Sequence, residues 1–362
     1  MVESNLRHIL LVFGGRSGEH DVSAISASNI LPYFDPRKYL VTLLYIARDG
    51  QWYLCDKDRF KCHSDVPDEI HASIDKRPAY LAIGVENGFR LVDAQSEKPV
   101  RVDMVFSVLH GIRGAGGYMQ GLWEIAGVEF VGPRVRGAAI GFDKDMMKRL
   151  WAYAGLPICN YLVFNKNDGD HAQWETIHQQ LGTPVFVKPS NSGSSLGVHK
   201  VGTENDLNTA LEDAFTYDDK VIIETCVEGS ELELYCFGCG KEIKTTIVRE
   251  TVVGNEFGYY SYEAKYGSDN ATLNEKYVPA RIPESAQAKA RHLGAEAYRV
   301  LDGRGLARID LFYSKAGEVI LNELNTVPSL MSPISQPSLW EHSGVSHYEL
   351  VDMMISEAVF SN

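Results

Sequence analysis

The sequence contains no long apolar run and no segment that would direct the chain into or across a membrane. Nowhere in its 362 residues does it approach the roughly 20 consecutive apolar residues that a membrane-spanning helix needs. The apolar run at residues 8–13 is too short for the core of a signal peptide and leads directly into Gly14 and Gly15. We therefore expect a cytoplasmic protein without a membrane partner.

Cysteine is scarce, and the balance of charge is acidic. The six cysteines are scattered, and only Cys236 and Cys239 have C-x-x-C spacing, with no second pair of ligands nearby. This pattern favours buried free thiols over a zinc or redox site. The net charge of −13 argues against nucleic acid or an anionic membrane as partner. A phosphate-binding site in this chain must therefore be locally basic.

The first part of the chain alternates strand and helix patterns. Residues 7–15, 39–47 and 103–111 have the composition of buried strands, and residues 21–34 that of a helix. Such alternation predicts an α/β fold with a parallel sheet, in which ligands lie at the carboxyl ends of the strands. The less regular stretch from Asp49 to Arg101 predicts an insertion with short strands.

Length and pattern together predict more than one domain. Beyond Gly132 and Pro133 a second strand-and-helix unit begins, and residues 220–238 cross from it into a third. We expect an N-terminal α/β domain at residues 1–132, a central subdomain at residues 133–225 and a C-terminal subdomain at residues 226–362. Neither internal repeats nor low-complexity segments interrupt this organisation.

Two short apolar segments near the C-terminus carry acidic residues. Residues 306–313 and 318–325 read as an antiparallel hairpin whose turn centres on Ala316 and Gly317. This register places Asp310 opposite Glu323, where like charges are destabilising unless a cation lies between them. Carboxylate oxygens are the ligands that Mg²⁺ prefers, so the pair predicts a metal–phosphate site. A solvated strand face is the alternative.

A strand that delivers Lys188 is followed by a loop rich in glycine and serine. Small residues let backbone N–H groups approach phosphate oxygens, the hydroxyls of Ser194 and Ser195 add donors, and Lys188 adds a positive charge. The pattern is not a Walker loop, because G-x-x-x-x-G-K-[ST] is absent. The alternative is a flexible hairpin tip.

Three further charged residues lie near the expected domain crossings. Lys144 is in the first turn of a predicted helix, Glu224 ends a buried strand, and Glu231 begins the next one. A crossing between domains is a common place for a cofactor ring, and Glu231 is suited to hold ribose hydroxyls. Each of the three has a solvated side chain as the alternative reading.

The motifs in their order resemble those of the D-alanine–D-alanine ligases of the ATP-grasp superfamily, and the resemblance runs nearly end to end. They are FGGRSGEHDVS from residue 13, LHGIRG from residue 109, VKPSNSGSSLGV from residue 187, EAKY from residue 263, ARID from residue 307 and NELNT from residue 322. The resemblance implies a three-domain ATP-grasp fold and a homodimer. It also implies synthesis of D-alanyl-D-alanine for peptidoglycan, in which ATP converts one D-alanine to an acyl phosphate that the amine of a second attacks.

The resemblance also assigns residues. It implies ATP contacts from Lys144, Lys188, Ser194, Ser195, Glu224, Glu231 and Lys265. It implies that Asp310, Glu323 and Asn325 bind two Mg²⁺ ions, for which Mn²⁺ can substitute. It implies catalytic roles for Glu19, Ser194, Tyr266, Lys265 and Arg308, and substrate contacts from His110, Ser329 and Ser335.

The sequence departs from the family where the second substrate binds. Ser329 stands where the family has glycine, and ungapped alignment places Ile334, with Ser332 and Ser335 nearby, where the family has a serine. The EAKY loop, in contrast, is similar to that of ligases that use an amine acceptor. Two alternatives therefore stay open beside D-alanine–D-alanine ligation. One is a ligase with another amine acceptor, and the other is a non-catalytic paralogue that binds nucleotide.

Overall fold

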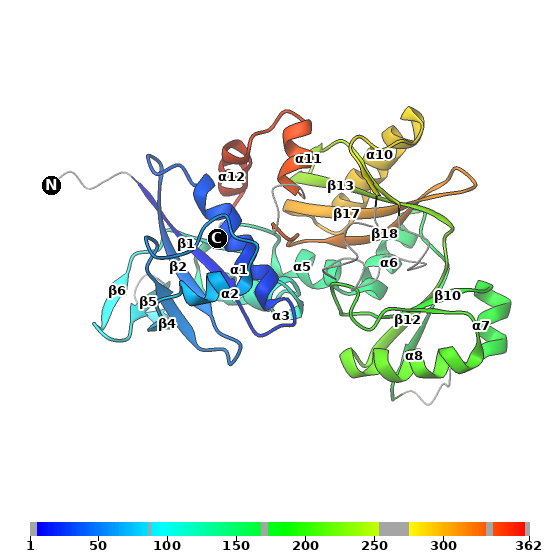
Figure 1. The fold of residues 1–362 in the computed structure, drawn as a ribbon, viewed down its shortest axis with the longest axis horizontal. Coiled ribbons are helices and arrows are strands. Elements are labelled where there is room, and N and C mark those ends of the chain that lie inside the picture. Colours follow the sequence, from blue (N-terminus) through cyan, green and yellow to red (C-terminus); the bar gives the residue numbers. More distant parts are fainter. Residues whose placement is uncertain (1–5, 86–87, 168–172, 253–274, 331–335, 359–362) are drawn as a thin grey trace.

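The computed structural model describes residues 6–85, 88–167, 173–252, 275–330 and 336–358 of the chain (Figure 1). The strands are β1 (Arg7–Gly14), β2 (Tyr39–Ile46), β3 (Trp52–Cys55), β4 (Arg77–Val85), β5 (Gly88–Asp93), β6 (Lys98–Val100), β7 (Met104–Ser107), β8 (Glu129–Phe130), β9 (Tyr161–Asn165), β10 (Val185–Pro189), β11 (His199–Val201), β12 (Lys220–Thr225), β13 (Gly229–Cys239), β14 (Glu242–Thr245), β15 (Arg249–Val252), β16 (Glu275–Tyr277), β17 (Arg304–Ser314) and β18 (Val319–Asn325). The helices are α1 (His20–Ile30), η1 (Leu31–Tyr33), α2 (Pro67–Ala72), α3 (Ile112–Ala115), α4 (Tyr118–Ala126), α5 (Val135–Phe142), α6 (Lys144–Tyr153), α7 (Trp174–Leu181), α8 (Glu204–Tyr217), α10 (Glu284–Val300), α11 (Gln336–His342) and α12 (His347–Ser356).

The first sheet has the order β6-β5-β4-β3-β2-β1-β7-β8. Strands β2, β1, β7 and β8 are parallel, which confirms the parallel sheet expected from the alternating pattern. The stretch after Asp49 adds the antiparallel strands β3 to β6 to one edge, as the expected insertion with short strands. It also contains the short helix α2, which the sequence pattern did not indicate.

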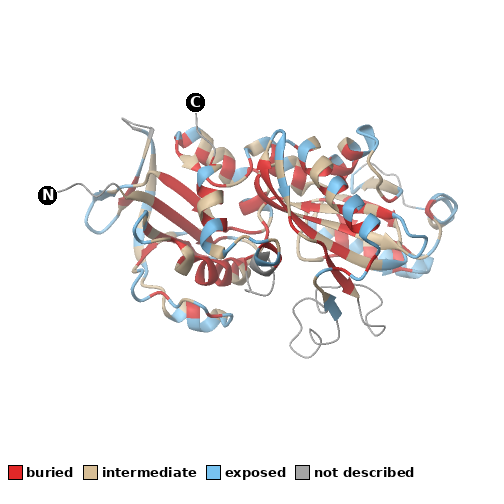
Figure 2. Cartoon of the chain, turned by 90° about the horizontal axis from the view of Figure 1, so that it is seen from above, coloured by how far each residue is buried: buried red, intermediate tan, exposed pale blue. Residues whose placement is uncertain are grey.

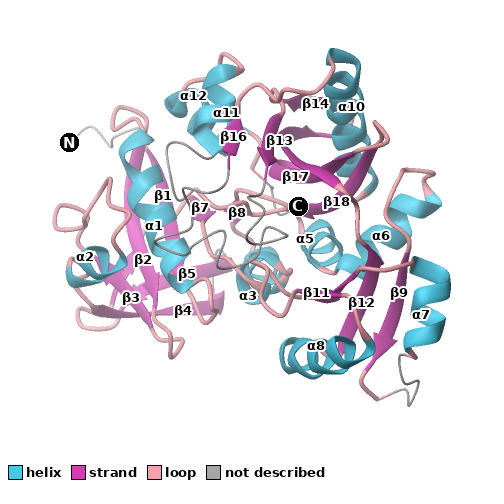
Figure 3. Cartoon of the chain, turned by 45° about the vertical axis from the view of Figure 1, so that its right-hand side comes forward, coloured by secondary structure: helices cyan, strands magenta, loops and turns pink. Residues whose placement is uncertain are grey.

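Two further sheets lie beyond the first (Figure 3). The second has the antiparallel order β11-β10-β12-β9, and its core is shared with α7 and α8. The third has the order β16-β15-β13-β17-β18, with β14 paired to β13, and it packs against α6 and α10. These sheets fit the three-domain ATP-grasp architecture, while the domain boundaries given above stay a prediction.

Buried residues concentrate on strands in the interior of the molecule (Figure 2), among them β1, β12 and β13, and on α1. The largest core of the described chain joins Ile9 and Leu11 of β1 to Leu350 and Met354 of α12. The last helix therefore packs on the same core as the first strand. No helix in the described segments is both long and apolar enough to span a bilayer.

Candidate active site

A cavity of about 630 Å³ opens where the three sheets meet. Its lining comes from distant parts of the sequence. Glu19 and His110 follow strands of the first sheet, Lys188 and Ser194 belong to the second sheet and its loop, and Asp310 lies on the third. All the predicted site residues that the structure describes line this one cavity. Lys265, Tyr266 and Ser335, like Ser332 and Ile334, lie outside the described residues.

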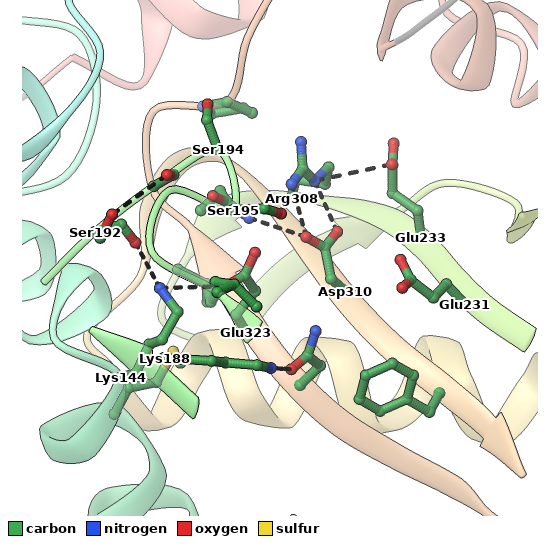
Figure 4. A pocket seen from close by; sticks show the side chains of 18 of the residues that line it. Lys144, Lys188, Ser192, Ser194, Ser195, Glu231, Glu233, Arg308, Asp310 and Glu323 are labelled. Atoms are coloured by element: carbon green, nitrogen blue, oxygen red, sulfur yellow. Dashed lines mark hydrogen bonds and ion pairs between the residues drawn. The ribbon is translucent and has the colours of Figure 1, made fainter. Parts of the chain in front are cut away.

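The β17–β18 hairpin presents the predicted metal ligands to the cavity (Figure 4). Asp310 pairs with Glu323 and Arg308 with Asn325, as the sequence predicts. Next to the turn, however, Tyr313 pairs with Val319, one residue away from the predicted register. A β-bulge between these two positions accounts for the difference: the register shifts between Asp310 and Leu311, and Asn322 of β18 has no paired residue on β17.

Asp310 lies at the centre of a polar cluster on this hairpin. Its two carboxylate oxygens accept hydrogen bonds from Arg308 Nε and a terminal guanidinium nitrogen, both at 2.7 Å, and Asn325 Nδ2 donates to it at 3.1 Å. Burial and the carboxylates of Glu233 and Glu323 raise the pKa of Asp310, although Arg308 opposes the shift. A carboxylate whose charge is disfavoured in this way gains from an added cation. The oxygen donors of Asp310, Glu323 and Asn325 therefore fit Mg²⁺.

The glycine- and serine-rich loop joins the central sheet to the first domain. Lys144 Nζ donates to the carbonyl of Ser192 at 2.6 Å and lies 3.5 Å from Glu323 Oε2. Ser194 and Ser195 have positive φ angles, 53° and 59°, a conformation that costs energy outside glycine and is frequent at functional sites. Ser194 Oγ donates to Glu19 Oε1 at 2.5 Å, so the structure brings together two residues that the resemblance assigns to catalysis.

A buried group of charges lies beneath the loop. Glu224 is 1% exposed and pairs with Lys188 through Oε1 and with Lys148 through Oε2, the latter at 3.1 Å. Burial alone would raise the pKa of Glu224, but the two ammonium groups outweigh it and lower the pKa to about 2. Glu224 and Lys144 are thus not the solvated side chains of the alternative reading. The sequence reading missed Lys148, because a lysine in an amphipathic helix normally lies on the solvated face.

A row of charged side chains crosses four strands of the third sheet. Arg249, Glu233, Asp310 and Glu323 are neighbours in register on β15, β13, β17 and β18. Glu233 forms an ion pair with Arg249 and lies 3.9 Å from Arg308 Nε. The sequence analysis also did not identify Arg249 and Glu233 as site residues, since neither belongs to one of the family motifs. Glu231 lines the cavity two residues before Glu233.

His110, which follows β7, and Ser329 also line the cavity. His110 is 5% exposed, and its Nδ1 lies 3.2 Å from the carbonyl of Val327. Burial lowers the pKa of His110, although the charge of Glu19 opposes this effect. The lowered pKa favours the neutral imidazole near pH 7. Ser329 lines the cavity two residues beyond Val327, where the family has glycine.

Lysines of α6 and β10 lie beside the carboxylate hairpin in this cavity, an arrangement that suits an ATP-dependent ligase of the ATP-grasp class, and the chain belongs to that class. Two family models match the chain: D-ala D-ala ligase N-terminus over residues 8–133 and D-ala D-ala ligase C-terminus over residues 150–356. The chain belongs to the D-alanine–D-alanine ligase family.

Relatives agree over nearly the whole chain. The D-alanine–D-alanine ligase of Shouchella clausii is 37% identical over 354 residues, which cover 98% of this chain and 95% of that protein. The ligase of Acetivibrio thermocellus is 38% identical over 371 residues, covering 98% and 96%. Among solved structures, the D-alanine–D-alanine ligase of Coxiella burnetii has a TM-score of 0.83 at 27% identity, covering 98% and 94% of the two chains. The VanG D-Ala:D-Ser ligase of Enterococcus faecalis has a TM-score of 0.82 at 29% identity, covering 97% and 99%.

Proposed function

We propose that this chain joins two D-alanines at the expense of ATP, through an acyl phosphate of the first. The observation that carries the proposal is the convergence of Glu19, Lys188 and Asp310 on one cavity from three sheets. A carboxylate that can hold an ammonium group, a cation that can hold phosphate and a metal-binding carboxylate are what this chemistry needs together. We further propose that the enzyme is cytoplasmic and dimeric, as the family resemblance implies.

The chain's own residues would divide the work by position. Lys144 and Lys188 would hold the inner phosphates of ATP, and Glu224 and Glu231 its base and ribose. Asp310, Glu323 and Asn325 would hold Mg²⁺, which when bound neutralises charge on the transferring phosphoryl group. Phosphoryl transfer depends mainly on such positioning and charge stabilisation.

The first substrate would bind between the first domain and the glycine- and serine-rich loop. Glu19 would hold its ammonium group, with Ser194 fixing the direction of the carboxylate through the hydrogen bond at 2.5 Å. Arg308 would face the oxygen that becomes negative in the tetrahedral intermediate, where a fixed cation stabilises the transition state. Lys265 and Tyr266 would complete the site, as the resemblance implies.

The second candidate function has the same first step and a different amine acceptor. Ser329 favours it, because a side chain lines the cavity at the position where the family has none. The VanG relative is named as a D-Ala:D-Ser ligase, so acceptor choice varies among proteins of this fold.

Phosphate release in the presence of ATP, Mg²⁺ and D-alanine tests the proposal, with the product identified by mass spectrometry. We expect release that depends on all three and a product with the mass of D-alanyl-D-alanine. A panel of D-serine and other D-amino acids at fixed D-alanine, with the hydroxy acid D-lactate as a comparison, then separates the two candidates. Absence of any D-alanine-dependent phosphate release would refute both and favour the non-catalytic paralogue.

A further inference from the structure

Helix α1 contains serines whose side chains are completely buried. Ser23, Ser26 and Ser28 all have 0% exposure. A serine inside a helix offers its hydroxyl in competition with the backbone, so a buried one needs a partner of its own. Ser23, for example, accepts a hydrogen bond from the N–H of Gly14 and donates to the carbonyl of Val108, which holds α1 on the first sheet.

Ser26 contacts a segment more than 300 residues away. Its Oγ accepts a hydrogen bond from the N–H of Leu330 at 3.1 Å and lies 3.1 Å from Nε2 of His110. Because Nδ1 of His110 faces the carbonyl of Val327, which can only accept, Nδ1 carries the proton. In the neutral ring Nε2 is then an acceptor, and the hydroxyl of Ser26 can donate to it. When it does not, the carbonyl of Val22 at 2.8 Å receives that proton.

The backbone on both sides of Ser329 is thus tied to the first domain. Ser26 accepts a hydrogen bond from the N–H of Leu330, and His110 donates one to the carbonyl of Val327. We call these two side chains the clamp. Both clamp side chains are buried, and the segment between their bonds lines the cavity through Val327, Pro328 and Ser329. Fixing two backbone groups three residues apart leaves little freedom for Pro328 and Ser329 between them.

We propose that Ser26 is a positioning residue that, together with His110, fixes residues 327–330 where the acceptor amine binds. The inference rests on the proposed function, because it assigns the acceptor to the part of the cavity that residues 327–329 line. Ser26 itself does not line the cavity. It acts through the backbone N–H of Leu330 and through the ring of His110.

The substitution Ser26→Ala tests the clamp, and Ser28→Ala is its matched control. Ser28 lies on the same helix, is equally buried, accepts from the N–H of Ser64 and donates to the carbonyl of Lys61, away from the cavity. We expect Ser26→Ala to raise KM for the acceptor D-alanine by about tenfold, the equivalent of about 1.4 kcal/mol. KM for ATP should stay within about twofold, since the phosphate and metal residues are untouched. Ser28→Ala should change neither constant.

Hydrogen exchange supplies a readout that does not depend on activity. The amide of Leu330 should exchange faster in Ser26→Ala than in wild type, and at the wild-type rate in Ser28→Ala. Ser26→Cys, which keeps the shape and a weak donor, should give intermediate exchange and remains available if the alanine variant does not fold.

The outcomes separate the two proposals. If wild type makes no D-alanyl-D-alanine, the proposed function fails, while exchange at Leu330 still decides whether the clamp exists. Equal exchange in wild type, Ser26→Ala and Ser26→Cys overturns the clamp. An equal rise of both KM values in Ser26→Ala, or the same rise in Ser28→Ala, overturns its role in placing the acceptor.

Discussion

Replacing Glu224 should destabilise the protein far more than replacing Lys148, although the two side chains pair with each other. Glu224 lies between two cations, Lys148 and Lys188, and the exposed fractions of the three side chains are 2%, 1% and 11%. Removing Lys148 leaves the ion pair of Glu224 and Lys188, which has no net charge. Removing the charge of Glu224 leaves two buried ammonium groups without an anion.

The expected magnitudes follow from this arrangement. Glu224→Gln removes the carboxylate that pairs with both buried lysines, and it should lower the free energy of unfolding by about 3–5 kcal/mol. The lowered pKa of Glu224, about 2, has the same sign, because the folded protein favours the charged carboxylate. Lys148→Met leaves only Oε2 of Glu224 without a partner and should cost about 1–3 kcal/mol.

Urea denaturation at pH 7 of wild type, both single variants and the double variant measures these losses. We expect the double variant to be more stable than Glu224→Gln alone, because one of the two uncompensated lysines is then gone. Arg149→Met is the control, since Arg149 pairs with Asp145 on the same helix but its side chain is 61% exposed. That change should cost no more than about 1 kcal/mol.

The pH dependence has a definite sign. Because the pKa of Glu224 is lower in the folded protein, its contribution to stability is complete above its unfolded value near 4.5. It should disappear as the pH falls from there toward about 2. A Lys148→Met variant as unstable as Glu224→Gln, or strictly additive losses in the double variant, would refute this account of the buried group.

Three further outcomes follow from the hairpin and the acceptor segment. Glu323→Ala should lower kcat by about 10³-fold or more, because charge neutralisation is the main catalytic contribution, and near-normal phosphate release from the folded variant would contradict the metal assignment. Mg²⁺ should raise the melting temperature of wild type but not of Asp310→Asn, because burial and the carboxylates of Glu233 and Glu323 disfavour the charge of Asp310 until a cation is present; an equal rise in both proteins would place the ion elsewhere. Ser329→Gly should lower KM for the acceptor D-alanine and leave KM for ATP unchanged, since it restores the space that the family keeps open. Steady-state kinetics with one substrate varied at a time measures both constants. An unchanged KM for the acceptor would show that Ser329 does not crowd it.

The pairing of Asp310 with Glu323 could be predicted because alternation and turn chemistry are local properties of the sequence. The bulge that makes this pairing hold was not predictable, since an extra residue in one strand leaves no composition signal. Asn322, the bulged residue, lies 3.4 Å from Lys188 Nζ through its Oδ1. The predicted register was therefore right at the pair of Asp310 and Glu323 and wrong by one residue next to the turn.

Other parts of the site depend on contacts between distant segments. Lys148, Glu233 and Arg249 acquire their roles only when strands or helices far apart in the sequence pack together. Each looks like an ordinary surface charge in its own segment. Ser26 gives no sequence signal at all, because its partners are a ring and a backbone N–H supplied by two other parts of the fold. Family motifs pointed to residues that line the cavity, and only packing identifies the residues that hold them in place.

The core that α12 shares with β1 bears on the order in which the chain folds during synthesis. Ile9 and Leu11 leave the ribosome first, but Leu350, Met354 and Ile355 complete the same core. The first sheet can form early and α1 packs on this core, but the part of the core that α12 covers stays open until translation has passed residue 355. The first part of the chain to be made is thus among the last to be completely packed, and its core keeps exposed apolar surface in the meantime.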